Sequence, residues 1–381
     1  MSKIVEKNQG NPFEMQVETE QPQQGPQQNS FWKKVKAVLH YIFIDGLSGM
    51  AIGLFATLII GTIIENVGKL FGDWAIAEYI VLAGRFAKFM MGAGIALGMG
   101  YKLKKSPLVS ISAGVVGMLA SFVSKIADGV GISYTAVGEP LGAFIASFVA
   151  LEVGSLVSGK TKVDIIVTPL TSVFSGALVA FLIGKPIASF MSLLSGLIQT
   201  AGEQQPFLMG ILVAVLMGVF LTLPISSAAI GVTLGLNGVV AGAAVVGCCT
   251  QMVGYAVMSF RENKWGGLLA QGLGTSMLQM PNLVKKPILW LPPVLVSAVL
   301  GPISTCVFHM TSSAVGSGMG TAGLVGVIET FTTMVATESW WIVLLKILSL
   351  DLVLPALLCW LISEFMRKKN WIKEGDLKLD L

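Results

Sequence analysis

The sequence predicts an all-α, polytopic integral membrane protein with eight to ten transmembrane helices and at least one re-entrant segment. Apolar residues fill 54% of the 381 positions and charged residues 12%, about half the charged share of a soluble domain. The apolar residues gather in runs of about 20, the length that crosses a bilayer core. Residues 309–338 are too rich in glycine and polar side chains for a lipid-facing helix, yet they lie between two such runs.

The N-terminal region is polar and carries no cleavable signal peptide. Residues 1–30 end in the Gln/Pro-rich run 21–28, which predicts a disordered cytoplasmic tail. The first apolar run is therefore expected to stay in the protein. Residues 32–42 mix basic and apolar side chains, as in a helix that lies on the membrane surface. The membrane domain is expected over 31–366, and 367–381 form a short cytoplasmic tail.

The apolar runs define the expected spans in chain order. Residues 186–201 are a shorter run that favours an interfacial helix. Residues 206–260, interrupted by Pro224 and Asn237, hold two or three crossings. The other expected spans are 46–66, 76–100, 107–124, 138–158, 163–183, 288–308 and 339–365.

Basic residues predict the orientation, because lysine and arginine accumulate in cytoplasmic loops. The alternate connections are acidic, with Glu65, Asp73 and Glu78 after the first span and Asp128 after the third. Both termini are therefore expected in the cytoplasm of a bacterial inner membrane, which requires an even number of crossings between 163 and 261. The basic clusters are Lys33-Lys34-Lys36, Lys102-Lys104-Lys105, Lys160-Lys162, Arg261-Lys264, Lys285-Lys286 and Arg367-Lys368-Lys369.

Several classes of function are disfavoured. The chain has 4 cysteines and 2 histidines, and no C-x-x-C spacing, so neither a metal site nor a cofactor is predicted. No H-E-x-x-H or G-x-S-x-G motif is present, and we expect no phosphate-binding loop. The net charge of +4 is modest, and no nucleic-acid partner is expected. A lipid bilayer and a small polar solute remain as partners.

Two cations in the second expected span are candidates for solute contact. Arg85 and Lys88 are three residues apart and share one helix face. A charge at a helix centre costs about 2.5–3.5 kcal/mol on insertion. They are therefore expected to point inward or to find acidic partners, unless they lie near enough to the interface to extend into water.

A second candidate region is 129–142, where glycines and polar residues precede a span. Glu139 stands directly before Pro140, where the next helix should begin. Its carboxylate fits either a helix cap or a solute contact. Glu152 lies later in the same span, where burying a carboxylate costs more. It is a slightly weaker candidate for a solute contact than Glu139.

The third region is 309–338, for which we expect a re-entrant hairpin that lines the solute path, with an ordinary external loop as the alternative. Its glycine amides and carbonyls would be free to bond a hydroxyl-rich ligand. Glu329 and His309 would add charged or switchable contacts.

Four runs of sequence carry a resemblance to a known family. Together they resemble the sugar-permease (EIIC-like) membrane subunits of the phosphotransferase system, in particular the stand-alone branch that includes toxin-expression regulators. The runs are Gly247-Cys248-Cys249-Thr250-Gln251-Met252-Val253-Gly254, Ser259-Phe260-Arg261-Glu262-Asn263, Gly272-Leu273-Gly274-Thr275-Ser276-Met277-Leu278-Gln279-Met280-Pro281-Asn282 and Gly318-Met319-Gly320-Thr321-Ala322-Gly323-Leu324-Val325-Gly326.

The resemblance implies a membrane domain that passes a sugar inward while a cytoplasmic partner phosphorylates it, often as a homodimer. Sugar permeases of this kind hold the sugar with a Gly-x-x-Glu motif and a nearby histidine. Gly326 and Glu329 fit that motif here, with Thr330 where the family has proline, and His309 would be the histidine.

Two hypotheses for function stay open. In the first, the chain is a permease that moves a sugar or sugar acid, with Arg85, Glu139, His309, Gly326 and Glu329 in contact with it. Residues 367–381 are too few for a phosphoryl-carrying domain, so the donor is expected to be a separate cytoplasmic subunit and no phosphoryl-carrying residue is expected here. In the second, the same fold senses a solute and reports through the basic loop 261–287 without transport.

Overall fold

The protein is described by a computed structural model, which describes residues 30–71, 74–127, 129, 131–133 and 138–379. The chain divides into two units, Met1–Leu39 and His40–Leu381. The described part of the first unit belongs to helix α1 (Ser30–His40), and the remainder of the text concerns the second unit.

The described residues are helical, with turns, loops and one isolated pair of bridging residues, Gly238 and Ser312. The prediction of an all-α protein is confirmed for these residues. The α-helices of the second unit are α2 (Leu47–Leu54), α3 (Ile60–Leu70), α4 (Ala75–Phe89), α5 (Met91–Lys102), α6 (Pro107–Ser121), α7 (Val123–Ala127), α8 (Pro140–Val157), α9 (Asp164–Gly202), α10 (Pro206–Thr222), α11 (Ser227–Thr233), α12 (Gly238–Met258), α13 (Phe260–Leu269), α14 (Met280–Lys285), α15 (Leu291–Pro302), α16 (Val325–Met334), α17 (Trp340–Ile347) and α18 (Leu354–Lys368).

Short π- and 3-10 segments connect several of these helices. The π-helical segments are η1 (Tyr41–Gly46), η2 (Phe55–Ile59), η3 (Ala270–Gly274), η6 (Ile303–Val307) and η8 (Leu348–Val353), and the 3-10 segments are η4 (Ser276–Gln279), η5 (Pro287–Trp290) and η7 (Ala322–Leu324).

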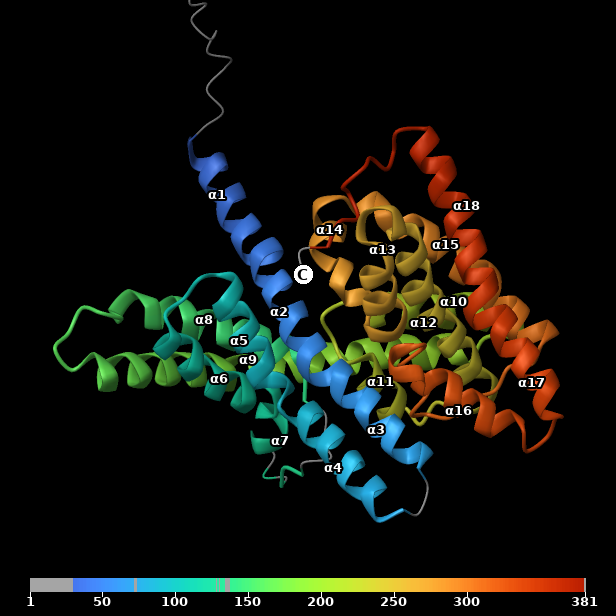
Figure 1. The fold of residues 1–381 in the computed structure, drawn as a ribbon, viewed down its shortest axis with the longest axis horizontal. Coiled ribbons are helices and arrows are strands. Elements are labelled where there is room, and N and C mark those ends of the chain that lie inside the picture. Colours follow the sequence, from blue (N-terminus) through green and yellow to red (C-terminus); the bar gives the residue numbers. More distant parts are fainter. Residues whose placement is uncertain (1–29, 72–73, 128, 130, 134–137, 380–381) are drawn as a thin grey trace, which may run out of the picture. The chain divides into compact units, whose positions relative to one another are not determined.

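Two groups of helices make up the second unit, and α9 packs against both. Helices α5, α6 and α8 pack together, and α10, α12, α15 and α18 form the other group (Figure 1). Helix α9 contacts α6 and α8 along one part of its length and α10 and α11 along another. One buried cluster of apolar side chains includes residues of both groups, from α2, α5, α6 and α8 as well as α12, α15 and α18, and another joins the end of α9 to α10 and α12.

Helix α12 is the central element of its group, and nearly all of its side chains are buried. Its glycines allow this packing, because a Cβ on Gly247 would overlap the backbone of Ala214 and one on Gly242 would overlap that of Met310. Small residues at such crossings are the usual means by which membrane helices approach closely.

Six helical runs among the described residues are long and apolar enough to cross a membrane, or seven if the bent pair α4–α5 counts as one span. The expected total of eight to ten is not confirmed. Helices α6 and α10, with 15 and 17 residues, are shorter than that length. The six runs are Lys34–Lys69, Pro140–Val157, Asp164–Gly202, Gly238–Met258, Pro287–Val307 and Trp340–Lys368.

The prediction of a span at 163–183 followed by a separate interfacial helix at 186–201 is wrong. Helix α9 runs through both as one helix of 39 residues, with Pro169 and Pro186 inside it. Proline interrupts helices in water because it lacks an N–H donor. In a membrane helix it is tolerated, because neighbouring groups can satisfy the freed carbonyl and no water competes for the backbone.

The expected span at 76–100 is broken. Ile76–Phe89 and Met91–Lys102 meet at Met90 with a bend of 56°. This bent pair is either a broken span or a re-entrant loop. The acidic residues Asp73 and Asp128, on which part of the orientation rests, lie outside the described residues, as does part of 129–142.

The last residues of the chain fold back onto the domain. Helix α18 continues to Lys368, and the segment after it buries the side chains of Ile372 and Leu377. The side chains of Asn263 and Gln279 both donate to the carbonyl of Leu377, at 2.8 and 3.0 Å. Residues 367–381 were expected as a short tail, and the described part of them is packed against residues 259–286. This region was expected as a loop, and we keep the name loop region for it, but it consists of the short helices α13, η3, η4 and α14.

Candidate functional site

The glycine-rich segment 316–326 is buried inside the protein. Ser317 and Thr321 are fully buried, and residues around them form turns rather than a continuous helix. Polar contacts from α3, α11 and α12 and within the segment hold it in place. The hydroxyl of Ser227 donates to the carbonyl of Gly318 at 2.8 Å, and the hydroxyl of Thr321 lies 3.5 Å from the sulfur of Met252. The amide of Asn66 donates to the carbonyl of Gly323, and the N–H of Gly326 donates to the carbonyl of Gly320 at 2.9 Å.

Irregular backbone at membrane depth persists only where protein or a water-filled cavity surrounds it. The burial of 316–326 against α3, α11 and α12 meets this condition. Residues 316–326 are therefore not an exposed loop, and re-entry of 309–338 into the membrane stays a prediction.

Lys346 contacts residues at both ends of the segment 309–338. Its ammonium donates to the carbonyl of Phe308 at 2.9 Å and to the carboxylate of Glu338 at 2.7 Å. Phe308 and Glu338 stand at the two ends of 309–338. One side chain from α17 therefore ties both ends of the segment together.

The glycines of the segment are required by close packing. A Cβ on Gly318 would overlap the backbone of Ser227, and one on Gly320 would come within 2.8 Å of the Cys248 and Cys249 backbone. Gly320 and Gly323 also have φ values of +51° and +52°, which favour glycine. The glycine backbone was expected to be free for a ligand, whereas the Gly326 N–H is already bonded to Gly320.

Glu329 lies on α16 directly after this segment and is half-buried. Its carboxylate accepts a hydrogen bond from the hydroxyl of Ser313 at 2.7 Å. Its side chain also flanks Gly316, at the other end of the turn. His309 is exposed, with a φ of 47°. Both residues lie in the described part of the chain, and no hydrogen bond joins them.

Arg85 belongs to a cluster of charges between α3 and α4. The carboxylate of Glu65 is buried and pairs with Arg85 Nε at 3.2 Å, with Lys69 Nζ at 3.2 Å and with Lys88 Nζ. Arg85 and Lys88 were expected to need an acidic partner, and Glu65 is that partner. Glu65 itself was expected in an outer connection, but it lies within α3.

This charge cluster lies next to the buried segment. Asn66, the residue after Glu65, bonds Gly323, and a Cβ on Gly323 would come within 2.7 Å of the Thr62 side chain. Three cations surround one carboxylate, so the cluster carries a formal excess of two positive charges. Such an excess attracts an anionic group.

Glu139 approaches the same segment from the other side. Its carboxylate caps α8 by accepting from the N–H of Leu141 at 3.4 Å, and it also contacts the backbone of Ser226. The next residue, Ser227, bonds Gly318. The structure therefore connects Glu139 to the buried segment through two serines, whereas Glu152 is engaged elsewhere.

Glu152 has a structural role in an ion pair. Its carboxylate lies 2.8 Å from the ammonium of Lys105, which comes from the loop between α5 and α6, and it accepts a hydrogen bond from Tyr41 at 2.7 Å. These contacts satisfy the charge that made Glu152 costly in a span.

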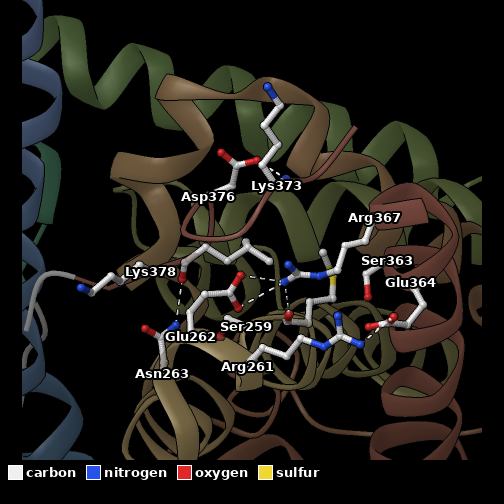
Figure 2. A network of polar contacts seen from close by, with 12 residues as sticks. Ser259, Arg261, Glu262, Asn263, Ser363, Glu364, Arg367, Lys373, Asp376 and Lys378 are labelled. Carbon is white, nitrogen blue, oxygen red and sulfur yellow. Dashed lines mark hydrogen bonds and ion pairs between the residues drawn. The ribbon is translucent and has the colours of Figure 1, made fainter. Parts of the chain in front are cut away.

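A second polar assembly lies where the loop region 259–286 meets the end of α18, and Figure 2 shows it. The guanidinium of Arg367 bonds both carboxylate oxygens of Glu262, at 2.9 and 3.2 Å, and the carbonyl of Met258 at 3.0 Å. Arg261 pairs with Glu364 at 2.9 Å nearby.

Sequence reasoning missed two fully buried polar residues. Asp351 lies in η8, inside the last span, and Gln251 lies in α12. Their side-chain polar atoms have no hydrogen-bond partner among the described residues. Asp351 had a visible signal, because it is an acidic residue inside a run of 29 apolar-rich residues.

These features define a class of protein. A helical membrane domain with broken helices and a buried, non-helical segment is the architecture in which polar solutes cross a bilayer. Residues 44–379 match the family model described as "Phosphotransferase system, EIIC". The chain therefore belongs to the EIIC family, the membrane transport components of the phosphotransferase system, which implies a sugar substrate and partner subunits of that system. A comparison with curated proteins gave no match.

Proposed function

We propose that this chain is the permease subunit that moves a sugar or sugar acid inward across the bacterial inner membrane, while a separate cytoplasmic subunit phosphorylates it. The observation that carries the proposal is the buried segment 316–326, with Glu329 beside it and the Glu65–Arg85 cluster against it. Both termini would be cytoplasmic, the working unit a homodimer, and the chain a member of the stand-alone branch.

The solute is proposed to bind between the segment and the groups that surround it. Glu329 would accept hydrogen bonds from hydroxyls of the solute, and His309 would donate to them. Glu139 would bond the solute at the position where its side chain caps α8. Gly326 would shape the turn through its bond to Gly320. Rigid-body movement of one helix group against the other would then open the site to either side in turn.

The excess positive charge around Glu65 favours a sugar acid over a neutral sugar. Lys69 and Arg85 are 58% and 38% exposed, whereas Lys88 is 19% exposed, and of the two more exposed cations only Arg85 has a guanidinium. Arg85 can therefore turn towards a carboxylate on the solute while Lys88 keeps Glu65 neutralised. A bidentate guanidinium–carboxylate contact would fix the solute's orientation.

The test is solute binding by purified protein, screened over sugars and sugar acids, followed by uptake in vesicles. Glu329→Gln keeps the side chain's shape and removes its charge. It should leave expression near normal and weaken binding by about 1–3 kcal/mol, the range for a lost charged hydrogen bond. Arg85→Gln should weaken binding of sugar acids more than that of neutral sugars.

The matched control is Glu203→Gln, because Glu203 is exposed at the end of α9. Glu338 is unsuitable as a control, since it holds Lys346 at one end of the segment 309–338. If Glu329→Gln binds the solute as tightly as the parent does, the site near α16 is wrong and Arg85 and Glu139 become the primary candidates.

The alternative function, a solute sensor, is favoured by the polar assembly of Figure 2. That assembly joins the loop region 259–286 to the last span through Arg367 and Glu262. A change at the buried segment would reach the surface by this link. Solute binding without uptake in vesicles that contain the phosphoryl-carrier subunit would support a sensor.

A further inference from the structure

Asp351 lies near the middle of the last membrane span. The run Trp340–Lys368 extends eleven residues before it and seventeen after it. At about 1.5 Å per residue, the carboxyl is roughly 16 Å from one end and 25 Å from the other. The side chain is fully buried, with 0% of its surface exposed. It therefore lies in protein interior at membrane depth.

Neither carboxyl oxygen of Asp351 has a hydrogen-bond partner among the described residues. The thiol of Cys249, on α12, interacts with this carboxyl, although not at the distance and angles of a normal hydrogen bond. A thiol is a weak donor and carries no positive charge. Nothing described in its surroundings neutralises an ionised carboxylate.

Other titratable groups on the elements packed against η8 are either engaged elsewhere or distant. Helix α17 contributes Lys346, which bonds Glu338 and Phe308. Helix α18 contributes Arg367 and Glu364, each paired with the loop region 259–286, and Lys368 at its far end. The remaining groups are neutral thiols and a phenol, on Cys248 and Tyr255 of α12 and Cys359 of α18.

An isolated carboxylate in such surroundings is very costly, and it is stable there only when neutralised. We propose that Asp351 is an intramembrane proton-binding site: its carboxyl holds a proton in the conformation described here, and loss of that proton accompanies a change in conformation of the domain. The ligand is the proton, so proton binding does not depend on the identity of the solute, and only its coupling to the solute site rests on the proposed function.

The backbone around Asp351 is suited to such a change. Pro355 has no N–H, and its ring excludes the carbonyl of the residue four positions earlier, which is Asp351. The helix widens here into the π-helical segment η8. Single π-helical turns often occur at functional sites, because they leave the ladder of backbone hydrogen bonds irregular.

Asp351 also lies close to the contact that holds the buried segment. Its neighbour Cys249 is packed against Gly320, whose Cβ position would be 2.8 Å from the Cys249 backbone nitrogen. An ionised Asp351 carboxylate would need water or a polar group beside it. Separation of α12 from the buried segment 316–326 would let water reach the carboxylate. Loss of the proton is therefore coupled to opening of the proposed solute site.

Infrared spectroscopy tests the proposal on the purified full-length chain in proteoliposomes at neutral pH. A protonated carboxyl has a C=O stretch well separated from the two stretches of a carboxylate. The band should be present in the parent, should move when aspartate is labelled with carbon-13 at its carboxyl, and should be lost in Asp351→Asn. The label distinguishes the band of a protonated aspartate from that of a protonated glutamate, such as Glu139.

The control is Asp164→Asn, because Asp164 accepts hydrogen bonds from the Gly159 N–H and the Thr168 hydroxyl at the start of α9. It should leave the band unchanged. A second readout is the emission of Trp340, Trp341 and Trp360 in the last span, which should shift as the pH rises in the parent but not in Asp351→Asn. Absence of a label-sensitive band in the parent would overturn the proposal even if the variant failed to fold.

Discussion

Replacing Arg367 with methionine should lower the free energy of unfolding by about 3–5 kcal/mol, the usual loss when one member of a buried ion pair is removed. The side chains of Arg367 and Glu262 are 10% and 3% exposed. Arg367 bonds both oxygens of Glu262 and the Met258 carbonyl. Methionine keeps the length of the side chain but leaves the Glu262 carboxylate buried without a cation.

The measurement is equilibrium unfolding of the purified protein in mixed detergent micelles, followed by tryptophan fluorescence. Arg261→Met is the matched control, because its pair with Glu364 is 62% exposed on the arginine side. It should cost about 0.2–1 kcal/mol, as exposed pairs do. The double variant Arg367→Met/Glu262→Leu should recover most of the loss. Equal losses for Arg367→Met and Arg261→Met would refute the assignment of a buried pair.

Three further predictions concern the C-terminal segment, helix packing and orientation. Burial alone would raise the pKa of Asp376, but hydrogen bonds from the Lys286 ammonium and the Lys373 N–H hold that pKa below its ordinary value. The ionised Asp376 carboxylate therefore stabilises the folded protein above the pKa it has when unfolded, and this stabilisation is lost as the pH falls through its lower pKa in the folded protein. Asp376→Asn should lower the free energy of unfolding by about 0.5–1 kcal/mol at pH 7 and have no effect well below about pH 4. Equilibrium unfolding at both pH values measures this. Gly247→Ala should destabilise by about 1–3 kcal/mol because its Cβ would overlap the Ala214 backbone, whereas Gly196→Ala, which meets nothing within 4 Å, should be neutral or stabilising in the same assay. In a Cys306→Ser background, thiols introduced at Lys104 and Lys285 should resist labelling from outside intact cells, and one introduced at Asp73 should react. Labelling of the thiol at Lys285 from outside would show that the orientation predicted for the C-terminal half is inverted.

The apolar runs predicted the helical membrane domain because hydrophobic length is a local property of the chain. The breaks between helices were harder to predict. A span at 163–183 and a separate interfacial helix at 186–201 were expected, whereas α9 continues through both, and it packs against α6, α8 and α10. The bend at Met90 is likewise absent from the sequence pattern, because it depends on how α4 packs on α3.

The residue types of the candidate site could be predicted from the sequence, whereas the contacts between them could be predicted only in part. The cost of Arg85 and Lys88 in a span predicted an acidic partner, but Glu65 could not be identified without the three-dimensional pairing of α3 with α4. The glycines of 316–326 were visible, whereas their close contacts with Ser227 and Cys249 arise from segments distant in sequence. Asp351 was overlooked because one carboxylate does little to the average polarity of a long apolar run.

The length of α9 makes bilayer thickness a mechanical variable for this protein. Its 39 residues would measure about 58 Å as a straight helix, against a hydrocarbon core of about 30 Å. Exposed apolar side chains run from Ile165 to Leu197, about 48 Å along a straight helix, so the helix must tilt steeply or bend at its two prolines to keep them in lipid. A thicker bilayer would draw it upright and a thinner one would flatten it. Because α9 packs against both helix groups, lipid chain length would change the angle between them, and with it the rate of the alternation proposed above.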